Sequence, residues 1–228
     1  MYKFTLTFYL ILTSVFATAV HADEAQDLTD IQQKWAIANY ELEDDAQIDA
    51  FTQLSEQSAL FVKNYPSSAQ THIWNGIVLA SFAGAKGGLG ALGLAKEAKA
   101  SLENALSIDG AALNGSAYAS LATLYSKVPG WPIGFGDDDK AEKLFKQALA
   151  FNLEGIDTNY LYGEYLYGEG DYKQAKARLL VAQAAGIRDT PAKAGRSFSG
   201  ARAYSLFAPR GLQRRAQWHS KARLRVPF

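Results

Sequence analysis

The chain has 228 residues, 48% of them hydrophobic, which is enough for one domain of ordinary size with a complete core. It contains no cysteine, which excludes disulfide bonds, thiolate metal sites, a cysteine nucleophile and a lipidated N-terminal cysteine. The formal net charge is zero, but residues 23–189 hold all 23 acidic residues with 13 basic ones, whereas residues 190–228 hold nine basic residues and no acidic one. This division indicates two parts of different role or origin.

Residues 1–22 have the pattern of a secretory signal peptide. Lys3 supplies a short positive region, Phe4–Phe16 is apolar with scattered threonines, and Val20–Ala22 places small residues before an expected cleavage at Asp23. The alternative is an uncleaved membrane anchor, but the apolar run is shorter than the ~20 residues of a spanning helix. The sequence therefore predicts an exported, periplasmic protein without a transmembrane segment after cleavage.

Residues 23–64 are expected to form two helices. Apolar residues recur at helical spacing from Ile31 to Leu42 and again from Ile48 to Val62, and Pro66 ends the second helix. Between residues 23 and 56 there are ten acidic residues and one lysine. We interpret these acids as a solvated helix face, with a surface for a basic partner as the alternative.

Three further helical pairs are expected in Ser67–Ser107, Ala111–Phe151 and Ile156–Gly186, where small and large apolar residues recur at matching positions. In the last pair, Gly163 and Ala175 are 12 residues apart. The matching residues are 19 apart in the middle pair (Ala122 and Ala141) and 22 apart in the first (Gly76 and Ala98). The sequence therefore predicts two inserted turns, one within Gly84–Gly93 and one within Lys127–Gly136.

The two inserts leave the same kind of turn in successive pairs, so we expect both on one edge of the molecule. Trp131, Ile133 and Phe135 are too apolar to be left free in solvent, which predicts that the second insert packs on the first or on a partner. Local repair of the core is the alternative. In the first insert, Lys86 lies close to the free amides of the next helix, where an anion would bind.

The alternation Tyr162-Gly163, Leu166, Ala175, Leu179 and Ala182, with its counterpart in Tyr118–Ala148, resembles the tetratricopeptide repeat. The runs Ala83–Leu92 and Val128–Asp138 look like a family of exported bacterial tetratricopeptide proteins of unassigned function. The layout is more distantly similar to the T component of tripartite ATP-independent periplasmic transporters.

This resemblance implies an all-α fold for residues 23–189, an α-solenoid of about four helical pairs coiled as a right-handed superhelix. In the family, the first helix of each pair lines a concave groove. Carried onto this chain, the groove positions are Ile73, Ile77, Ala80, Ala119, Thr123, Ser126, Tyr160, Glu164 and Tyr167.

Three motifs that carry chemistry in other proteins are interpreted as structural. Gly88–Gly93 matches G-x-G-x-x-G, but no strand precedes it, so nucleotide binding is not expected. Asp137–Asp139 suits the start of a helix, with one aspartate as N-cap, better than a metal site. His72 lies inside a helix and is expected to be packed. Without a nucleophile–base pair, the sequence predicts no enzyme, no metal and no cofactor.

Residues 190–228 combine scattered glycines and prolines with poor helical periodicity, and Gln213–Leu224 is a candidate short capping helix. Three interpretations stay open for this basic tail. It is a disordered arm that binds an anionic surface, a capping segment folded against the acidic body, or the product of a reading-frame change, which would explain the loss of every acid.

The sequence favours a non-enzymatic exported scaffold that binds a protein or peptide through its groove and its loop edge. The alternative is a transporter-associated carrier whose inserts close a small-molecule pocket roofed by Trp131 and Phe135. A hydrolase with an unrecognised site is the third possibility, and nucleic acid is not an expected partner. The candidate binding residues are Tyr160, Glu164, Tyr167, Thr123, Ser126, Trp131, Phe135 and Lys86.

Overall fold

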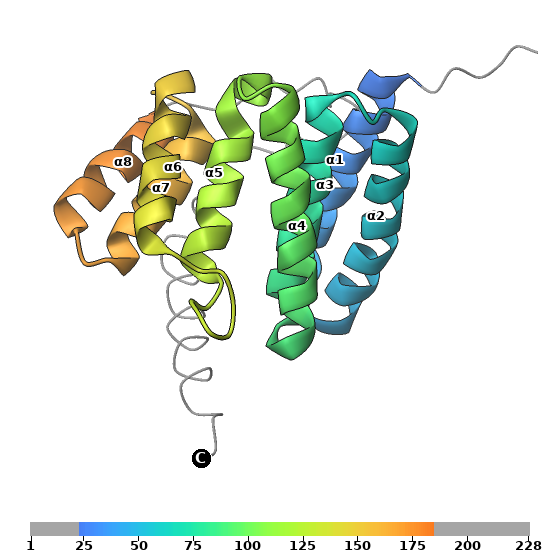
Figure 1. Cartoon of the computed structure of the whole chain (residues 1–228), viewed down its shortest axis with the longest axis horizontal. Coiled ribbons are helices and arrows are strands. Elements are labelled where there is room, and N and C mark those ends of the chain that lie inside the picture. The colour runs from blue at the N-terminus through green and yellow to red at the C-terminus, as the bar shows by residue number, and fades with distance from the viewer. Residues whose placement is uncertain (1–22, 185–228) are drawn as a thin grey trace, which may run out of the picture.

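The computed structural model describes residues 23–184 (Figure 1). The predicted signal peptide, residues 185–189 and the predicted basic tail lie outside the described residues. The described part consists of helices and contains no strand, which confirms the all-α prediction. Its helices are α1 (Glu24–Tyr40), α2 (Asp44–Asn64), α3 (Ala69–Lys86), α4 (Gly88–Ile108), α5 (Ala112–Lys127), α6 (Asp138–Phe151), α7 (Ile156–Gly168) and α8 (Tyr172–Ala184).

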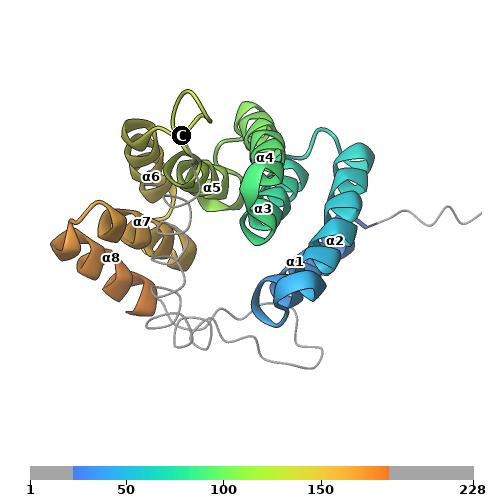
Figure 2. The ribbon, with the colours of Figure 1, turned by 90° about the horizontal axis from the view of Figure 1, so that it is seen from below.

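The helices form four successive pairs that follow one another along an arc, with α1, α3, α5 and α7 on its inner side (Figure 2). Each later pair begins with a helix that packs on both helices of the pair before it. Thus α3 contacts α1 and α2, α5 contacts α3 and α4, and α7 contacts α5 and α6. Stacking of this kind buries apolar faces that a single pair leaves in water.

Small residues at the predicted positions let the two helices of a pair approach closely. A Cβ atom added to Gly76 would lie 2.5 Å from Cγ of Leu102 on α4, and one added to Gly163 would lie 2.9 Å from Cγ of Leu179 on α8. Ala98, Ala122 and Ala141 are fully buried. The close-approach role predicted for these residues is confirmed.

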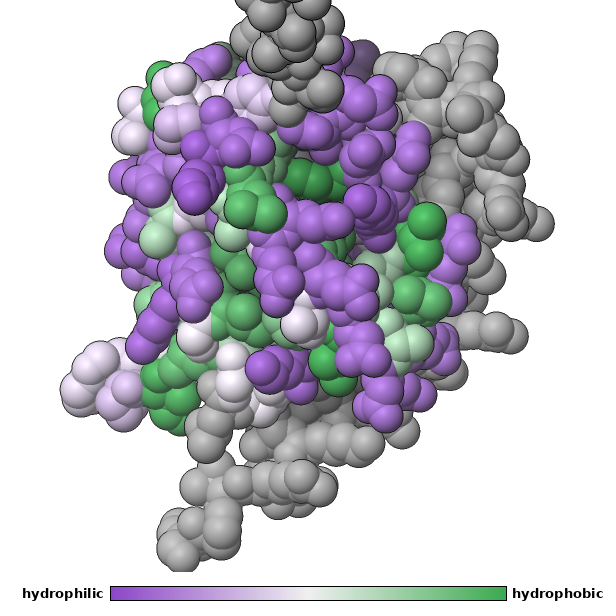
Figure 3. All heavy atoms as spheres, turned by 90° about the vertical axis from the view of Figure 1, so that its right-hand side faces the viewer, coloured by the Kyte–Doolittle hydropathy of each residue, from purple (hydrophilic) through white to green (hydrophobic). Residues whose placement is uncertain are grey.

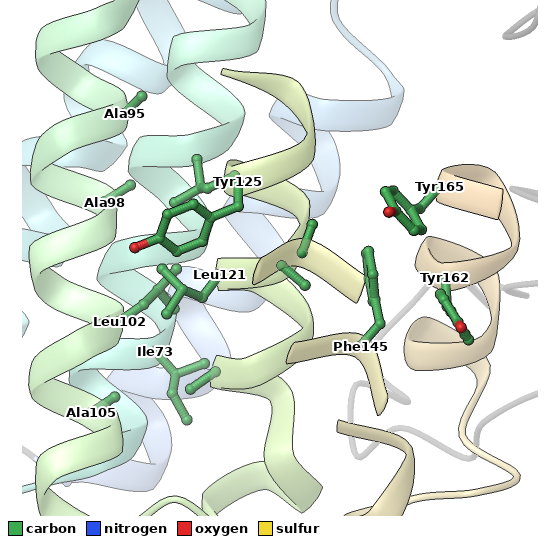
Figure 4. Close-up of a cluster of buried hydrophobic side chains, with 14 of the residues drawn as sticks. Ile73, Ala95, Ala98, Leu102, Ala105, Leu121, Tyr125, Phe145, Tyr162 and Tyr165 are labelled. Atoms are coloured by element: carbon green, nitrogen blue, oxygen red, sulfur yellow. The ribbon is translucent and has the colours of Figure 1, made fainter. Parts of the chain in front are cut away.

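Large side chains fill the space between the pairs. The Phe145 ring lies between α5 and the two tyrosines of α7, with its centroid 5.2 Å from that of Tyr162 and 5.4 Å from that of Tyr165 (Figure 4). A second cluster around Phe51 and Phe82 joins the first pair to α3. Burial of each such side chain contributes roughly 1.5–3 kcal/mol.

The first predicted insert is not a turn. The helix α3 continues to Lys86 and α4 begins at Gly88, so the added residues lengthen both helices, and the chain reverses at Gly87 and Gly88, both at φ +62°. The run contains no proline, but its glycines disfavour a helix, so the packing of α3 against α4 holds this stretch helical. Residues Gly88–Gly93 of the G-x-G-x-x-G motif therefore lie within α4.

The second predicted insert is a loop, which we define as residues 128–137. Its two prolines cannot continue a helix. Asp137 is the N-cap of α6, since its Oδ1 accepts a hydrogen bond of 3.0 Å from the backbone N–H of Lys140.

His72, within α3, is 8% exposed, and its Nε2 lies 2.9 Å from the carbonyl oxygen of Pro66. Both predictions, the N-cap and the packed histidine, are confirmed.

Candidate functional site

The 128–137 loop has a fixed backbone. Gly136 N–H donates to Pro129 O (2.9 Å), Gly134 N–H donates to Gly130 O (3.1 Å), and Asp137 N–H donates to Tyr125 O (3.0 Å). A Cβ atom on Gly136 would collide with the carbonyl oxygen of Val128, so the two ends of the loop approach closely only because that residue is glycine. The Trp131–Pro132 peptide bond is cis.

Phe135 anchors this loop to the body of the protein. Its ring meets that of Tyr125 edge to face at 5.5 Å, and Lys99 Nζ lies 5.8 Å from the Phe135 centroid. Lys99 also pairs with Glu103 at 2.7 Å, and this bond raises the pKa of the lysine. An aromatic ring attracts a nearby ammonium, so Lys99 ties the loop to α4. The sequence did not point to Lys99.

Trp131 and Ile133 lie at the opposite side of this loop, in solvent. Their side chains are 89% and 62% exposed. Within the described residues only Phe135 of the three packs on the body, so for Trp131 and Ile133 packing on a partner stays a prediction. The tight loop backbone leaves one ring beside Tyr125 and turns the other two side chains outward. Because Trp131 is almost fully exposed and is not enclosed by the described residues, it gives no support to the predicted small-molecule pocket.

Both inserts lie on the same edge of the molecule, the lower edge in Figure 1, as predicted. A Cβ atom on Gly134 would lie 3.4 Å from Leu92 Cδ1, so the loop sits beside the first turns of α4. Lys86 lies at the tip of α3 on this edge, with its Nζ 5.5 Å from the Phe82 ring and its aliphatic part over Gly90. The described residues thus bring Lys86 onto the edge that also carries the loop.

The inner side of the arc presents fewer of the predicted groove residues than expected. Ile73 and Ala119 are buried in the core and line no surface. Thr123 and Ser126 are half-buried and donate their hydroxyl hydrogens to carbonyls of their own helix, those of Ala119 and Thr123. Their donors are therefore already engaged.

Tyr160 and Glu164 form a pair on α7, with the tyrosine hydroxyl donating to the carboxylate at 2.7 Å. Burial, followed by the carboxylates of Asp157 and Glu164, raises the pKa of Tyr40 on α1 to about 12. The carboxylates of α7 thus act on a tyrosine of α1, at the other end of the arc. Tyr40 was not singled out by the sequence because it lies more than a hundred residues from α7 in the chain.

Aromatic residues continue from Tyr40 along the first pair. Trp35 meets Tyr40 and Trp74 edge to face, with ring centroids 5.5 Å and 5.7 Å away. Trp35 Nε1 donates to Ser81 Oγ at 2.8 Å. This cluster holds α1 against α3.

Tyr167 belongs to a different surface, a shallow apolar groove of about 280 Å³ between α7 and α8. Its ring meets that of Tyr172 at 5.2 Å, and both side chains are well exposed, at 45% and 63%. Tyr172 stays exposed because no described helix follows α8 to cover it. The groove is lined by Tyr167, Tyr172, Lys176, Leu179, Leu180 and Gln183.

Within residues 23–184 no three His, Asp or Glu side chains are grouped as a metal site would require. None of the helices in the same range combines the length and apolarity that a bilayer span needs. Comparison with models of protein families and with curated proteins found no match. The functional argument therefore depends on the surfaces described above.

Proposed function

We propose that this chain is a non-enzymatic exported scaffold of the tetratricopeptide type, a right-handed superhelix that binds a protein or peptide partner in the periplasm. The observation that carries this proposal is Trp131, 89% exposed on a loop whose backbone is fixed by hydrogen bonds. Tryptophan is enriched among the residues that dominate binding energy at protein interfaces. A loop already held in one conformation loses little entropy when it binds.

The neighbouring residues support the same conclusion. Ile133 adds a second exposed apolar side chain, and Lys86 adds a cation on the same edge. Phe135 packs inward on Tyr125 and holds the loop folded while Trp131 projects into solvent. A binding role at this edge also agrees with the repeat-like layout, because inserts in successive repeats often lie on the binding face.

The test places a photo-crosslinking phenylalanine derivative at position 131 and, in a matched chain, at position 153. Leu153 is a suitable control because it is 64% exposed and lies beyond the far end of the 14-residue helix α6. The two sites are thus separated by about 20 Å along that helix. We expect a discrete protein adduct from position 131 in periplasm and none from position 153.

A second variant, Trp131→Ala, should lose that partner in a pull-down while its thermal unfolding stays unchanged, since the side chain makes no core contact. The matched Leu153→Ala variant should retain the partner. Equal capture by both variants would move the binding site off the loop edge. The scaffold proposal would be rejected if neither chain, with the crosslinker at position 131 or at position 153, gave a protein adduct.

A further inference from the structure

The two ends of the arc differ. The face at the α1–α2 end is mostly hydrophilic, with hydrophobic residues set among polar ones (Figure 3). The α7–α8 pair instead presents the apolar groove, with Tyr172 63% and Leu180 52% exposed. In the three earlier pairs, the corresponding side is covered by the first helix of the next pair, namely α3, α5 and α7. The last described pair therefore lacks the covering segment that its three predecessors have.

We propose that Thr190–Phe207 of the same chain covers the α7–α8 groove. This inference concerns a surface apart from the 128–137 loop and does not depend on the proposed function. The segment lies close enough in the chain to reach the groove. The groove extends along α8 to Gln183, one residue before the last described residue, and only residues 185–189 separate Ala184 from Thr190. Earlier covering helices follow connections of only three or four residues, 65–68, 109–111 and 152–155.

Composition is the second argument. Thr190–Phe207 has 18 residues, as many as the covering helix α3. It carries Phe198, Tyr204 and Phe207, large apolar rings of the kind that fill the earlier pairs. Burying such rings against exposed apolar side chains is favourable by about 25 cal/mol per Å² of apolar surface.

Charge is the third argument. Thr190–Phe207 contains Lys193, Arg196, Arg202 and no acidic residue, whereas residues 23–184 carry 22 acidic and 12 basic residues. The charged residue that lines the groove is Lys176, so the attraction acts between the basic segment and the acidic body as a whole, not at the groove floor. Of the interpretations of the basic tail, this selects the capping segment.

The test uses the absence of cysteine from the full chain. Lys176→Cys places one thiol in the groove, and Phe198→Cys, Tyr204→Cys or Phe207→Cys places the second in the covering segment. Lys173→Cys is the matched control, because Lys173 is exposed on the same helix but does not line the groove. Both lysines are exposed, so neither substitution should affect folding.

After mild oxidation, we expect an intramolecular disulfide from position 176 with at least one of the three partners, at several times the yield from position 173. Peptide mapping by mass spectrometry identifies the bond. Equal yields from the two positions would overturn the proposal, as would the absence of any bond. Disulfides that join two chains through position 176 would also overturn it, since they would identify a second copy as the occupant.

Discussion

The close packing of α3 on α4 can be tested by replacing glycine with alanine at two positions, Gly76 and Gly84, and comparing the free energies of unfolding. Both glycines lie within α3, and alanine is favoured over glycine in a helix interior by about 1 kcal/mol. A Cβ atom on Gly84 would meet nothing within 4 Å. Gly84→Ala should therefore raise the free energy of unfolding by up to about 1 kcal/mol.

Gly76→Ala should have the opposite effect. The added methyl would lie 2.5 Å from Cγ and 2.8 Å from Cδ2 of Leu102, and 3.2 Å from the carbonyl oxygen of Ala98. Leu102 is fully buried and cannot swing aside into solvent. Overpacking of this kind costs about 1–3 kcal/mol, which exceeds the gain in helix propensity. We expect a net loss of about 1 kcal/mol, so the two variants should differ by about 2 kcal/mol.

Urea unfolding followed by far-ultraviolet circular dichroism measures both values. The packing explanation is checked by placing Gly76→Ala in a Leu102→Ala background, where the methyl has room and should stabilise the protein. The reasoning fails if Gly76→Ala is as stabilising as Gly84→Ala in the wild-type background. That result would mean that α3 and α4 lie farther apart than the structure shows.

Three further outcomes follow from the loop and from α7. Asp137→Ala removes the α6 N-cap and should lower the free energy of unfolding by about 1 kcal/mol, whereas Asp137→Asn keeps the cap and should change it little in the same urea titration. Gly136→Ala forces the backbone away from Val128, so it should both destabilise the protein and abolish the crosslink from position 131; an intact crosslink would contradict the loop geometry. Burial raises the pKa of Tyr165 from 10.0 to about 12, so the folded state keeps a proton that the unfolded state has lost, and stability should fall as pH rises from 10 to 12. Thermal unfolding of Tyr165→Phe should show a shallower decline over that range, and an unchanged slope would exclude Tyr165 as its cause.

The helical pairs and their close-approach residues could be predicted from sequence because both depend on local spacing. Gly163 and Ala175, for example, recur at a distance that only a short helical hairpin explains. The helical conformation of the first insert could not be predicted. A glycine-rich run indicates a turn when it is judged by its own composition, but a helix packed beside it can hold it helical. In this chain the long α3 and α4 support each other over that stretch.

One of the groove positions assigned in α3 lies in the core. Ile73 was assigned to the groove, but it is buried, and it is the adjacent Trp74 that meets Trp35 on α1. One residue turns a side chain by about 100° around the helix axis, so a small error in alignment exchanges core for surface. Contacts between distant segments, such as Tyr40 with the carboxylates of α7, have no local signal at all.

The first helix of each pair becomes shorter along the chain from the second pair onward, from 18 residues in α3 to 16 in α5 and 13 in α7. In a stack where each pair contacts only its neighbours, cooperativity is limited and opening proceeds from the weaker end. Amide hydrogen exchange should therefore be fastest in α7 and α8 and slowest in α3 and α4. The 128–137 loop, which carries Trp131, joins α5 to α6 and borders α4. It therefore stays attached to the slowly exchanging part of the molecule when the last pair opens.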